Sequence, residues 1–281
     1  MILISDEDLE RFLREDVPYG DLTTRSLGLN GRRARISFRA GAEMVAACPE
    51  EAGRLLRRLG CGVEDSLASG ARVAAGTLLL AGEGPAEAAF AAWKVAQTLM
   101  EYASGIATAA AGIVAAARAV QPGVVVACTR KACPGTRAVA VKAILAGGAV
   151  PHRLGLSDTL LLFPEHLAVL ADQPLEAAIA RLKAACPEKK VVVEVTSVAA
   201  AEAAARHGAD VVQLEKFPPD QVAEVVRRLA GTTALVAAAG GVNAGNAAAY
   251  AAAGARILVT SAPYAARPLD VKVAFQPGAP S

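Results

Sequence analysis

The second half of the chain alternates short apolar segments with amphipathic ones, and this alternation limits the fold more than any other feature. Continuous apolar strands separated by helices are typical of a parallel sheet that is covered by helices. The expected strands are Val124–Cys128, Thr159–Phe163, Val191–Val195, Val211–Leu214, Ala234–Ala238 and Ile257–Thr260. The expected helices between them are Leu175–Ala185, Ala199–His207, Asp220–Ala230 and Ala244–Ala252. These strands fit either an open doubly wound sheet or a closed barrel with a further strand that the pattern does not reveal.

The pattern before about residue 105 is mixed rather than regular. No linker separates the two parts, so we expect one long helix, from Pro85 to Tyr102, to join them. The other expected elements are a helix at Asp6–Arg14, strands at Ala34–Arg39 and Glu43–Ala47, a helix at Pro49–Leu59 and a hairpin over Gly70–Glu83.

Hydrophobic residues make up 54% of the 281 residues, whereas aromatic residues make up only 4%. The chain can therefore bury a sizeable core, which has to be built from Ala, Val and Leu with alanine-rich helices packed closely on their neighbours. The formal net charge is +2, from 29 basic and 27 acidic residues. This balance argues against a general nucleic-acid binder or a polybasic membrane-surface protein.

Cysteine usage and the N-terminus favour a cytoplasmic protein. The five cysteines form no CxxC pair and their number is odd, which argues against a disulfide framework or a structural zinc site. The chain turns acidic after four apolar residues, unlike a secretory signal. Charged residues and glycines interrupt the alanine-rich runs before the ~20 apolar residues that a membrane span needs, so no such span is expected.

Charged residues of opposite sign follow different strands. In parallel α/β folds, the carboxyl ends of the strands carry the chemistry. The cations come early, as Arg130-Lys131 after the first strand and His152-Arg153 before the second. The carboxylates come on two middle strands, as Glu194 and Glu215. We interpret these residues as one site with two groups of opposite charge.

The residue types indicate a phosphorylated sugar and an anionic partner. Arginine and lysine clamp phosphate or carboxylate groups, and paired carboxylates hold Mg²⁺ or sugar hydroxyls. The turn Gly240-Gly241 lets backbone N–H groups approach a phosphate, and Asn243 is expected to cap the helix behind it. Cys128 and Cys133 are interpreted as small packing residues rather than nucleophiles.

Several motifs resemble those of the quinolinate phosphoribosyltransferases, the carboxylating nicotinate-nucleotide pyrophosphorylases. Their order and spacing hold from about residue 15 to residue 273, which is nearly the whole chain. The matching segments are Glu15-Asp16-Val17, Gly20–Thr24, Ser104–Thr108, Thr129–Arg137, Gly147-Gly148 and His152–Asp158.

The resemblance implies an α/β architecture with two domains: an N-terminal α/β sandwich over residues 1–105 and an irregular, TIM-like α/β barrel over residues 106–270. Residues 271–281 would form a C-terminal tail, and the last turns of the chain can pack back onto the sandwich. The resemblance also implies a homodimer whose active sites are shared across subunits. The implied reaction transfers phosphoribose from phosphoribosyl pyrophosphate to quinolinate, with loss of carbon dioxide and pyrophosphate, and needs Mg²⁺.

The resemblance implies three groups of site residues. Those that would hold the carboxylate-bearing ring, the pyrophosphate or another substrate anion are Arg130, Lys131, Arg137, His152 and Arg153. Those that would face the ribose hydroxyls and Mg²⁺ are Glu194 and Glu215. Those that would surround the 5′-phosphate are Gly240, Gly241 and Ser261.

Two departures from the family pattern remove or weaken cations near the expected ring-acid site. Lys94 stands where the family has an arginine donated across the dimer, and Phe163 stands where it has a lysine. Lysine lacks the bidentate grip of arginine, and phenylalanine cannot bind a carboxylate. We therefore expect an acceptor that is less anionic, larger or flatter. This pattern resembles the ModD branch, pyrophosphorylase-like relatives named for an association with molybdate transport genes.

Two hypotheses stay open at this point. The first is an enzyme that uses phosphoribosyl pyrophosphate with Mg²⁺ and quinolinate or a related ring acid. The second is a member of the fold that has lost catalysis and binds a small anion as an accessory to molybdate transport. Retention of both charge groups favours the enzyme, because a lapsed site has no chemical reason to keep cations and carboxylates at the same strand ends.

Overall fold

The structure is a computed structural model that describes residues 4–170 and 172–279. The chain forms two compact units, each with a main sheet of its own. The first unit takes the residues up to Ala111, Cys133–Gly148 and the residues from Pro263 onward. The second unit takes Gly112–Ala132 and Ala149–Ala262.

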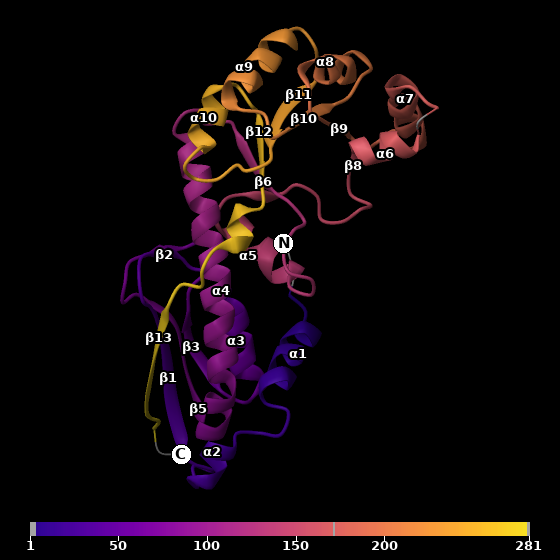
Figure 1. The fold of residues 1–281 in the computed structure, drawn as a ribbon. Coiled ribbons are helices and arrows are strands. Elements are labelled where there is room, and N and C mark those ends of the chain that lie inside the picture. The colour runs from indigo at the N-terminus through magenta and orange to yellow at the C-terminus, as the bar shows by residue number, and fades with distance from the viewer. Residues whose placement is uncertain (1–3, 171, 280–281) are drawn as a thin grey trace. The chain divides into compact units, whose positions relative to one another are not determined.

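The first unit is built on an antiparallel sheet with the strand order β13-β1-β5-β3 (Figure 1). Its helices are α1 (Asp6–Asp16), α2 (Leu22–Ser26), α3 (Pro49–Arg58), α5 (Arg137–Ala146) and most of α4 (Ala86–Arg118). Its strands are β1 (Arg33–Ala40), β2 (Met44–Val45), β3 (Gly62–Ser66), β4 (Arg72–Val73), β5 (Leu78–Pro85) and β13 (Val271–Pro277). In β1, every second residue from Ala34 to Ala40 is buried, so one face of this sheet carries the core.

The local elements of the first unit agree with the sequence better than the strand pairing does. α1, β1 and α3 lie within two residues of the expected positions, and α4 extends to Arg118 rather than ending near Tyr102. The hairpin expected over Gly70–Glu83 is wrong, because β4 pairs with β2 whereas β5 pairs with β1 and β3. Turn residues between two apolar runs show where the chain reverses, and they do not decide which strand each run joins.

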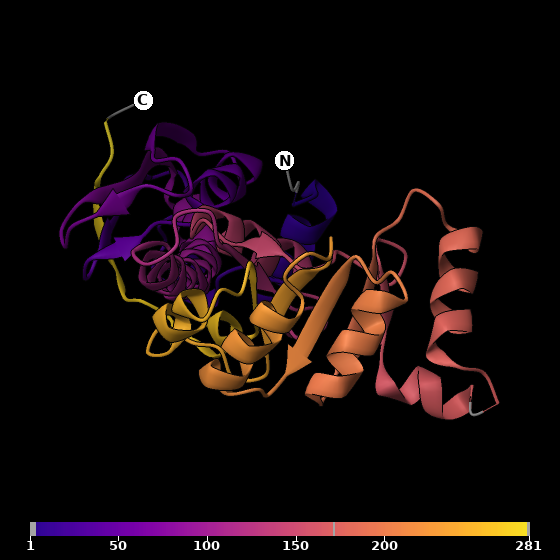
Figure 2. The same cartoon turned by 90° about the horizontal axis from the view of Figure 1, so that it is seen from above.

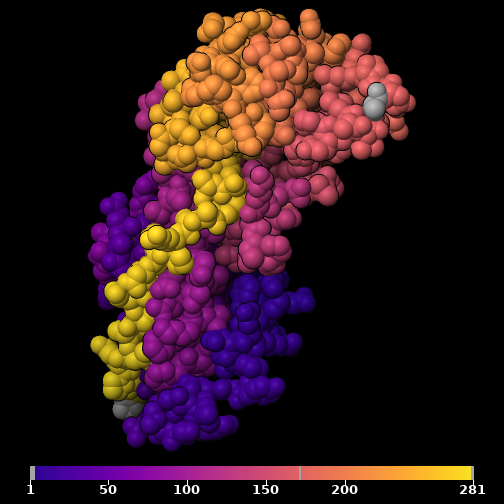
Figure 3. Space-filling model, viewed as in Figure 1, coloured from indigo at the N-terminus to yellow at the C-terminus, as the bar shows by residue number. Residues whose placement is uncertain are grey.

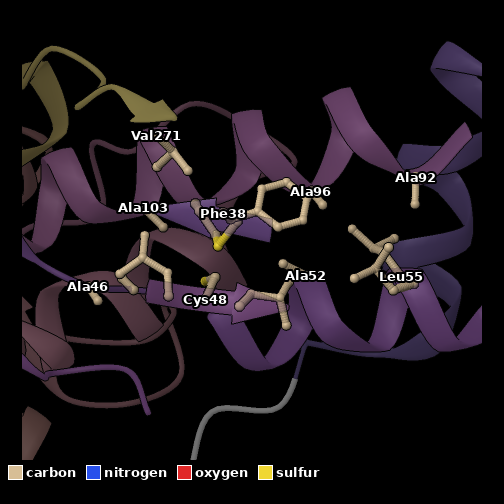
Figure 4. Packing of buried hydrophobic residues seen from close by; sticks show 14 of the residues in the cluster. Phe38, Ala46, Cys48, Ala52, Leu55, Ala92, Ala96, Ala103 and Val271 are labelled. Atoms are coloured by element: carbon tan, nitrogen blue, oxygen red, sulfur yellow. The ribbon is translucent and has the colours of Figure 1, made fainter. Parts of the chain in front are cut away.

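Small side chains let α4 pack closely on its neighbours in the first unit. Ala92, Ala96 and Ala103 are fully buried and lie in one cluster with Phe38 of β1 and Leu55 of α3 (Figure 4). Alanine favours the helix and adds little bulk, so the helix can approach the large side chains directly. The alanine-rich helix thus packs closely on its neighbours, as expected from the composition, with a few bulky residues filling the space between them.

The last strand of the chain completes the sheet of the first unit. β13 pairs antiparallel with β1, with Val271 opposite Ala40, and Gln97 Nε2 donates to the Val271 carbonyl oxygen over 2.8 Å. The segment before β13 passes so close to α4 that any Cβ at Gly105 would collide with the carbonyl oxygen of Arg267. The space-filling view shows this final segment (yellow) along α4 on the surface (Figure 3). The segment expected as a tail therefore contributes a strand.

The second unit is a parallel sheet surrounded by helices (Figures 1 and 2). Its strands are β6 (Val125–Cys128), β7 (Val150–Pro151), β8 (Leu160–Leu162), β9 (Val191–Val195), β10 (Val211–Glu215), β11 (Leu235–Ala239) and β12 (Ile257–Thr260). Its helices are α6 (Pro164–Val169), α7 (Leu175–Ala185), α8 (Val198–Arg206), α9 (Pro219–Arg228) and α10 (Ala247–Ala252). The six strands expected from the sequence are all present, each within one residue at either end.

The strand order identifies the second unit as an open barrel. The order is β7-β6-β12-β11-β10-β9-β8. The strands from β8 to β12 are neighbours in chain order, and β12 then pairs with β6, the first strand of the unit, as in a barrel. A doubly wound sheet reverses its order at a switch point, so that alternative is wrong. The strand that the sequence did not reveal is β7, whose two residues are too few to form a pattern. No pairing between β7 and β8 closes the ring within the described residues.

One helix in the described part of the chain, α4, is long and apolar enough to cross a membrane by length and composition. Lys94, Glu101 and two glycines interrupt the apolar run of this helix, as expected from the sequence. Half of its most apolar window is buried inside the structure, and Ala92 and Ala96 are core residues. Packing thus accounts for part of its apolar character, and the cytoplasmic location stays a prediction.

Gly147 ends α5 at a close approach to α4, which provides a test of this packing. A Cβ at Gly147 would lie 2.7 Å from Ala110 Cβ and would collide with the Ala107 carbonyl oxygen. We expect Gly147→Ala to lower the free energy of unfolding, measured in urea, by about 1–3 kcal/mol because the overpacked backbone cannot move aside. The control is Gly123→Ala, whose nearest neighbour is the end of the Arg256 side chain at 3.7 Å. Equal unfolding free energies for the two variants would contradict the prediction.

Candidate active site

A pocket of about 280 Å³ lies at the carboxyl ends of the parallel strands in the second unit. All but two of the site residues expected from the sequence line it: Arg130, Lys131, His152, Arg153, Phe163, Glu194, Glu215, Gly240, Gly241 and Ser261. The other lining residues are Thr129, Leu161, Gln213, Ala239, Val259 and Thr260. The sheet therefore brings together residues from segments that are far apart in the chain.

The two expected site residues that do not line the pocket, Lys94 and Arg137, belong to the first unit. Lys94 lies on α4, where its Nζ is 4.3 Å from the centroid of the Trp93 ring and 3.1 Å from Gln97 Oε1. The ammonium group thus has partners on its own helix. Arg137 is the first residue of α5. Their roles in substrate binding stay predictions.

The cationic side of the pocket is built by β6 and β7. Arg130 and Lys131 follow β6, and His152 and Arg153 follow β7, its neighbour in the sheet. The His152 backbone N–H donates to the Cys128 carbonyl oxygen over 2.8 Å, which fixes the second pair beside the first. Burial and the charge of Arg130 lower the pKa of Arg153, and burial and the charge of Arg153 lower the pKa of His152. A buried cation beside another cation favours an anionic ligand.

Phe163 forms an apolar wall beside the cations. Its backbone N–H donates to His166 Nδ1 over 3.0 Å, and the two rings stack with their centroids 5.7 Å apart. The guanidinium carbon of Arg153 lies 5.6 Å from the Phe163 ring centroid, within the range of a cation–π contact. The position where the family carries a lysine therefore presents a fixed aromatic ring to the pocket.

The carboxylate side is built by β9 and β10. Gln213 lies opposite Glu194 in the parallel register, and its Nε2 donates to Glu194 Oε2 over 2.6 Å. Glu215 follows two residues later on the same strand, on the face that Gln213 occupies. Burial raises the pKa of Glu194 and the negative charge of Glu215 adds to this, whereas the hydrogen bond from Gln213 opposes it. A polar residue inside the apolar run 211–214 is the sequence signal that could have revealed Gln213.

The turn at Gly240 requires glycine for steric reasons. Gly240 has φ +86°, and a Cβ there would lie 2.6 Å from Lys216 Cγ and 2.9 Å from Glu215 Oε1. Lys216 also has a positive φ of 60°, which is rare for a lysine. The backbone at this edge of the pocket is therefore shaped by two unusual conformations next to a site carboxylate.

Two asparagines hold the loop that follows Gly241. The side-chain amides of Asn243 and Asn246 each donate to the Gly241 carbonyl oxygen over 3.0 Å, and Asn243 Oδ1 accepts from the Gly245 N–H over 2.9 Å. Asn246, not Asn243, is the residue before α10. The expectation that Asn243 caps the helix is wrong, because its side chain closes a tight turn ahead of the helix instead.

Thr260, the last residue of β12, fixes the backbone around Ser261 at the edge of the pocket. Its Oγ1 donates to the Val242 carbonyl oxygen over 2.6 Å and accepts from the Ala262 N–H over 3.0 Å. Thr260 is buried, so these two bonds satisfy its hydroxyl and leave Ser261 at the pocket surface. The position of Ser261 thus depends on a buried neighbour.

The two cysteines near the site differ in environment. Cys128 is buried, and burial raises the pKa of its thiol to about 12, which makes it a packing residue as expected. Cys133 is exposed, so the expectation that it is a packing residue is wrong. Neither cysteine lines the pocket.

The comparisons with known proteins identify the family. The chain matches the description "Quinolinate phosphoribosyl transferase, N-terminal domain" over residues 21–104 and the C-terminal domain of the same family over residues 106–274. The chain belongs to the quinolinate phosphoribosyltransferase family. Its α/β architecture, a sandwich followed by an irregular barrel, is the one that the sequence motifs implied.

Relatives with sequence or structural similarity cover nearly the whole chain. A Rhodobacter capsulatus protein named "Putative pyrophosphorylase ModD" is 56% identical over 247 residues, which cover 88% of this chain and 95% of that protein. A Pasteurella multocida protein of the same name is 39% identical over 279 residues, 98% and 99% of the two chains. The crystal structure of NadC from Streptococcus pyogenes has a TM-score of 0.90 at 26% identity and covers 98% and 97% of the two chains.

The raised pKa of Glu194 predicts that this carboxylate costs stability at neutral pH. A carboxyl group with a raised pKa stabilises the folded state while protonated, and this stabilisation is lost as the pH rises through the raised pKa. Glu194→Gln, which is always neutral, should therefore have the higher free energy of unfolding at neutral pH, and the difference should disappear at acid pH.

Urea denaturation at neutral pH and at acid pH measures the difference in the free energy of unfolding between the variant and the wild type. The control is Glu202→Gln, at a half-buried position on α8 where the carboxylate pairs with Arg228 over 3.2 Å. This substitution removes a favourable charge and should not stabilise the protein. A Glu194→Gln variant that is less stable than the wild type at neutral pH would refute the prediction.

Proposed function

We propose that this protein is a phosphoribosyltransferase that transfers phosphoribose from phosphoribosyl pyrophosphate to quinolinate or a related ring acid, with release of pyrophosphate. The observation that carries this proposal is the separation of charge within one pocket. Cations follow β6 and β7, whereas carboxylates lie on β9 and β10. An anionic acceptor and a departing pyrophosphate need the cations, and a sugar that becomes cationic in the transition state needs the carboxylates. Membership of the family supports the same reaction.

The cationic side binds the two anions of this reaction. Arg130 and Arg153 hold a ring carboxylate, because guanidinium groups bind carboxylates through two parallel hydrogen bonds. Lys131 neutralises the departing pyrophosphate. His152 is neutral at neutral pH, since its pKa is lowered, so it contributes hydrogen bonds without further charge. In the homodimer that we propose for this family member, Lys94 of one subunit completes the site of the other.

The carboxylate side acts on the sugar. Glu194 and Glu215 stabilise the positive charge that develops at the anomeric carbon as the bond to pyrophosphate breaks and the bond to the ring nitrogen forms. Gly240, Gly241 and Ser261 supply backbone N–H groups and a hydroxyl for the 5′-phosphate. These residues do little covalent chemistry, and their main contribution is to align the ring nitrogen with the anomeric carbon.

The same carboxylates fit a magnesium ion that is shared with the substrate. In the described part of the chain, no group of three or more His, Cys, Asp or Glu residues could hold a metal. Magnesium is commonly held by one or two carboxylates together with substrate phosphates, and Glu194 and Glu215 supply two. Burial raises the pKa of Glu194 and the negative charge of Glu215 adds to this, and a cation would relieve the repulsion between the two carboxylates. Bound Mg²⁺ would offset part of the negative charge of the pyrophosphate.

Phe163 supports an acceptor that differs from quinolinate in charge or shape. The ring stands beside Arg153 in the pocket and offers a flat apolar surface. A planar ring acid can stack on such a surface, whereas a carboxylate directed at it would find no cation there. We therefore propose that the acceptor carries less negative charge, or a larger flat ring, on the side that faces Phe163.

An assay with purified protein, phosphoribosyl pyrophosphate, Mg²⁺ and a panel of ring acids tests the proposed function. We expect nucleotide and pyrophosphate to form with at least one ring acid, and Arg130→Ala to lower kcat/KM by about 100-fold or more because the acceptor anion loses its partner. Arg206→Ala, at the exposed end of α8, is the matched control and should retain activity. A protein that does not bind phosphoribosyl pyrophosphate with Mg²⁺ present would contradict the proposal, and tight molybdate binding would favour the lapsed, anion-binding alternative.

A second prediction concerns the acceptor. Phe163→Lys introduces a cation next to Arg153 and should raise kcat/KM for quinolinate by about tenfold, since each hydrogen bond to a charged group contributes about 1.5–3 kcal/mol. The control is Val169→Lys, which adds the same charge at a residue that is 86% exposed. Unchanged quinolinate kinetics in Phe163→Lys would show that Phe163 does not select the acceptor.

A further inference from the structure

Gln213 carries a polar atom without a partner at the wall of the pocket. The residue is only 4% exposed, and it lines the pocket between the two site carboxylates. Its Nε2 donates to Glu194 Oε2 over 2.6 Å, whereas its Oε1 has no hydrogen-bond partner in the described structure. Buried polar atoms are nearly always paired, so an unpaired one at a pocket wall indicates a group that a ligand satisfies.

The residues opposite Gln213 on the two neighbouring strands offer this oxygen no partner. On the other side of Gln213, the register of β10 and β11 places Ala237, a buried residue that has only a methyl group as its side chain. Rotating the amide by half a turn would set Oε1 against the carboxylate of Glu194, with no proton between two acceptors. The observed orientation is therefore the favourable one. It leaves Oε1 unpaired but enclosed, so a ligand reaches this oxygen when the side chain shifts toward the pocket.

The half-satisfied amide also argues against a purely structural role. A methionine or leucine would fill a similar volume in this apolar strand without burying an unpaired acceptor. An amide at this position fixes the carboxylate of Glu194 through one atom and keeps an unpaired acceptor on the other. Both functions concern the pocket rather than the core.

The neighbours of Gln213 define the chemistry of its ligand. Glu194, Gln213 and Glu215 together form a wall that carries hydrogen-bond acceptors. Such a wall complements a group with several donors, and the substrate of the proposed reaction has one, the adjacent hydroxyls of its ribose. A site built to bond a hydroxyl discriminates strongly against an analogue that lacks it.

We propose that Gln213 Oε1 accepts a hydrogen bond from a ring hydroxyl of the phosphoribosyl group, and that Gln213 thereby makes the site selective for ribose over deoxyribose. This inference rests on the proposed function and adds to it a residue that determines the choice of sugar. Gln213 acts on the sugar directly through Oε1 and positions Glu194 through Nε2.

Binding of three sugar phosphates to the full-length protein tests the inference. Ribose 5-phosphate and its 2-deoxy and 3-deoxy analogues are titrated by calorimetry, with a chelator present so that no metal contributes. The wild type should bind ribose 5-phosphate at least about tenfold more tightly than one of the analogues. Gln213→Met should lower this ratio by about fivefold, the effect of losing one hydrogen bond, mainly by weakening the binding of ribose 5-phosphate.

The control is Gln121→Met, the same substitution at the other glutamine with a buried, unpartnered Oε1, which does not line the pocket. It should leave the ratio unchanged. Retained binding of the deoxy analogues by Gln213→Met would show that the site is still folded. Gln213→Leu is a second apolar replacement and should have the same effect on the ratio.

Several results would overturn the inference. One is a wild-type protein that binds all three sugar phosphates equally, and another is a Gln213→Met variant that keeps the wild-type ratio. A loss in Gln213→Met that is equal for all three sugars would also overturn it, since that is the effect of a structural or metal-binding role. If phosphoribosyl pyrophosphate and a ring acid are still turned over in these cases, the inference fails and the proposed function stands. If the wild type binds neither ribose 5-phosphate nor phosphoribosyl pyrophosphate, both fail.

Discussion

The parallel pairing of the strands in the second unit is the constraint on which the site depends. Because all strands run in the same direction, each delivers its last residues to one edge of the sheet. Pairing of β6 with β7 brings Arg130 next to Arg153, and the register of β9 with β10 sets Glu194 opposite Gln213. A shift of one residue in the register of β10 would turn Gln213 to the other face of the sheet. The chemistry therefore depends on backbone hydrogen bonds rather than on contacts among the charged groups.

The site in turn opposes the stability of the fold. Burial and a second carboxylate raise the pKa of Glu194, and burial beside Arg130 lowers the pKa of Arg153. The turn at Gly240 tolerates no Cβ, and Lys216 beside it adopts a conformation that is rare for its residue type. Such groups persist only where the surrounding structure holds them, and they are typical of functional sites. The apolar strands and helices around the pocket supply that support.

Small residues make the packing of the first unit possible. Alanines along α4 let the helix approach Phe38, and Gly105 and Gly147 allow the backbone to pass where any side chain would collide. Two segments of sequence that resemble family motifs, those with Gly105 and Gly147, therefore have a structural explanation of their own. Similarity of motif alone does not separate residues that bind substrate from residues that permit close packing.

The sequence by itself determined the alternation of strands and helices, the position of six strands, and the two groups of charge that follow them. These features are local. Apolar periodicity indicates which residues are buried, and a polar residue after an apolar run indicates where the strand ends. Only the tertiary structure decided that β7 extends the sheet, that β4 and β5 do not pair with each other, and that the barrel stays open. It also revealed the unpaired oxygen of Gln213, because whether a buried atom has a partner depends on neighbours from other strands that no local pattern specifies.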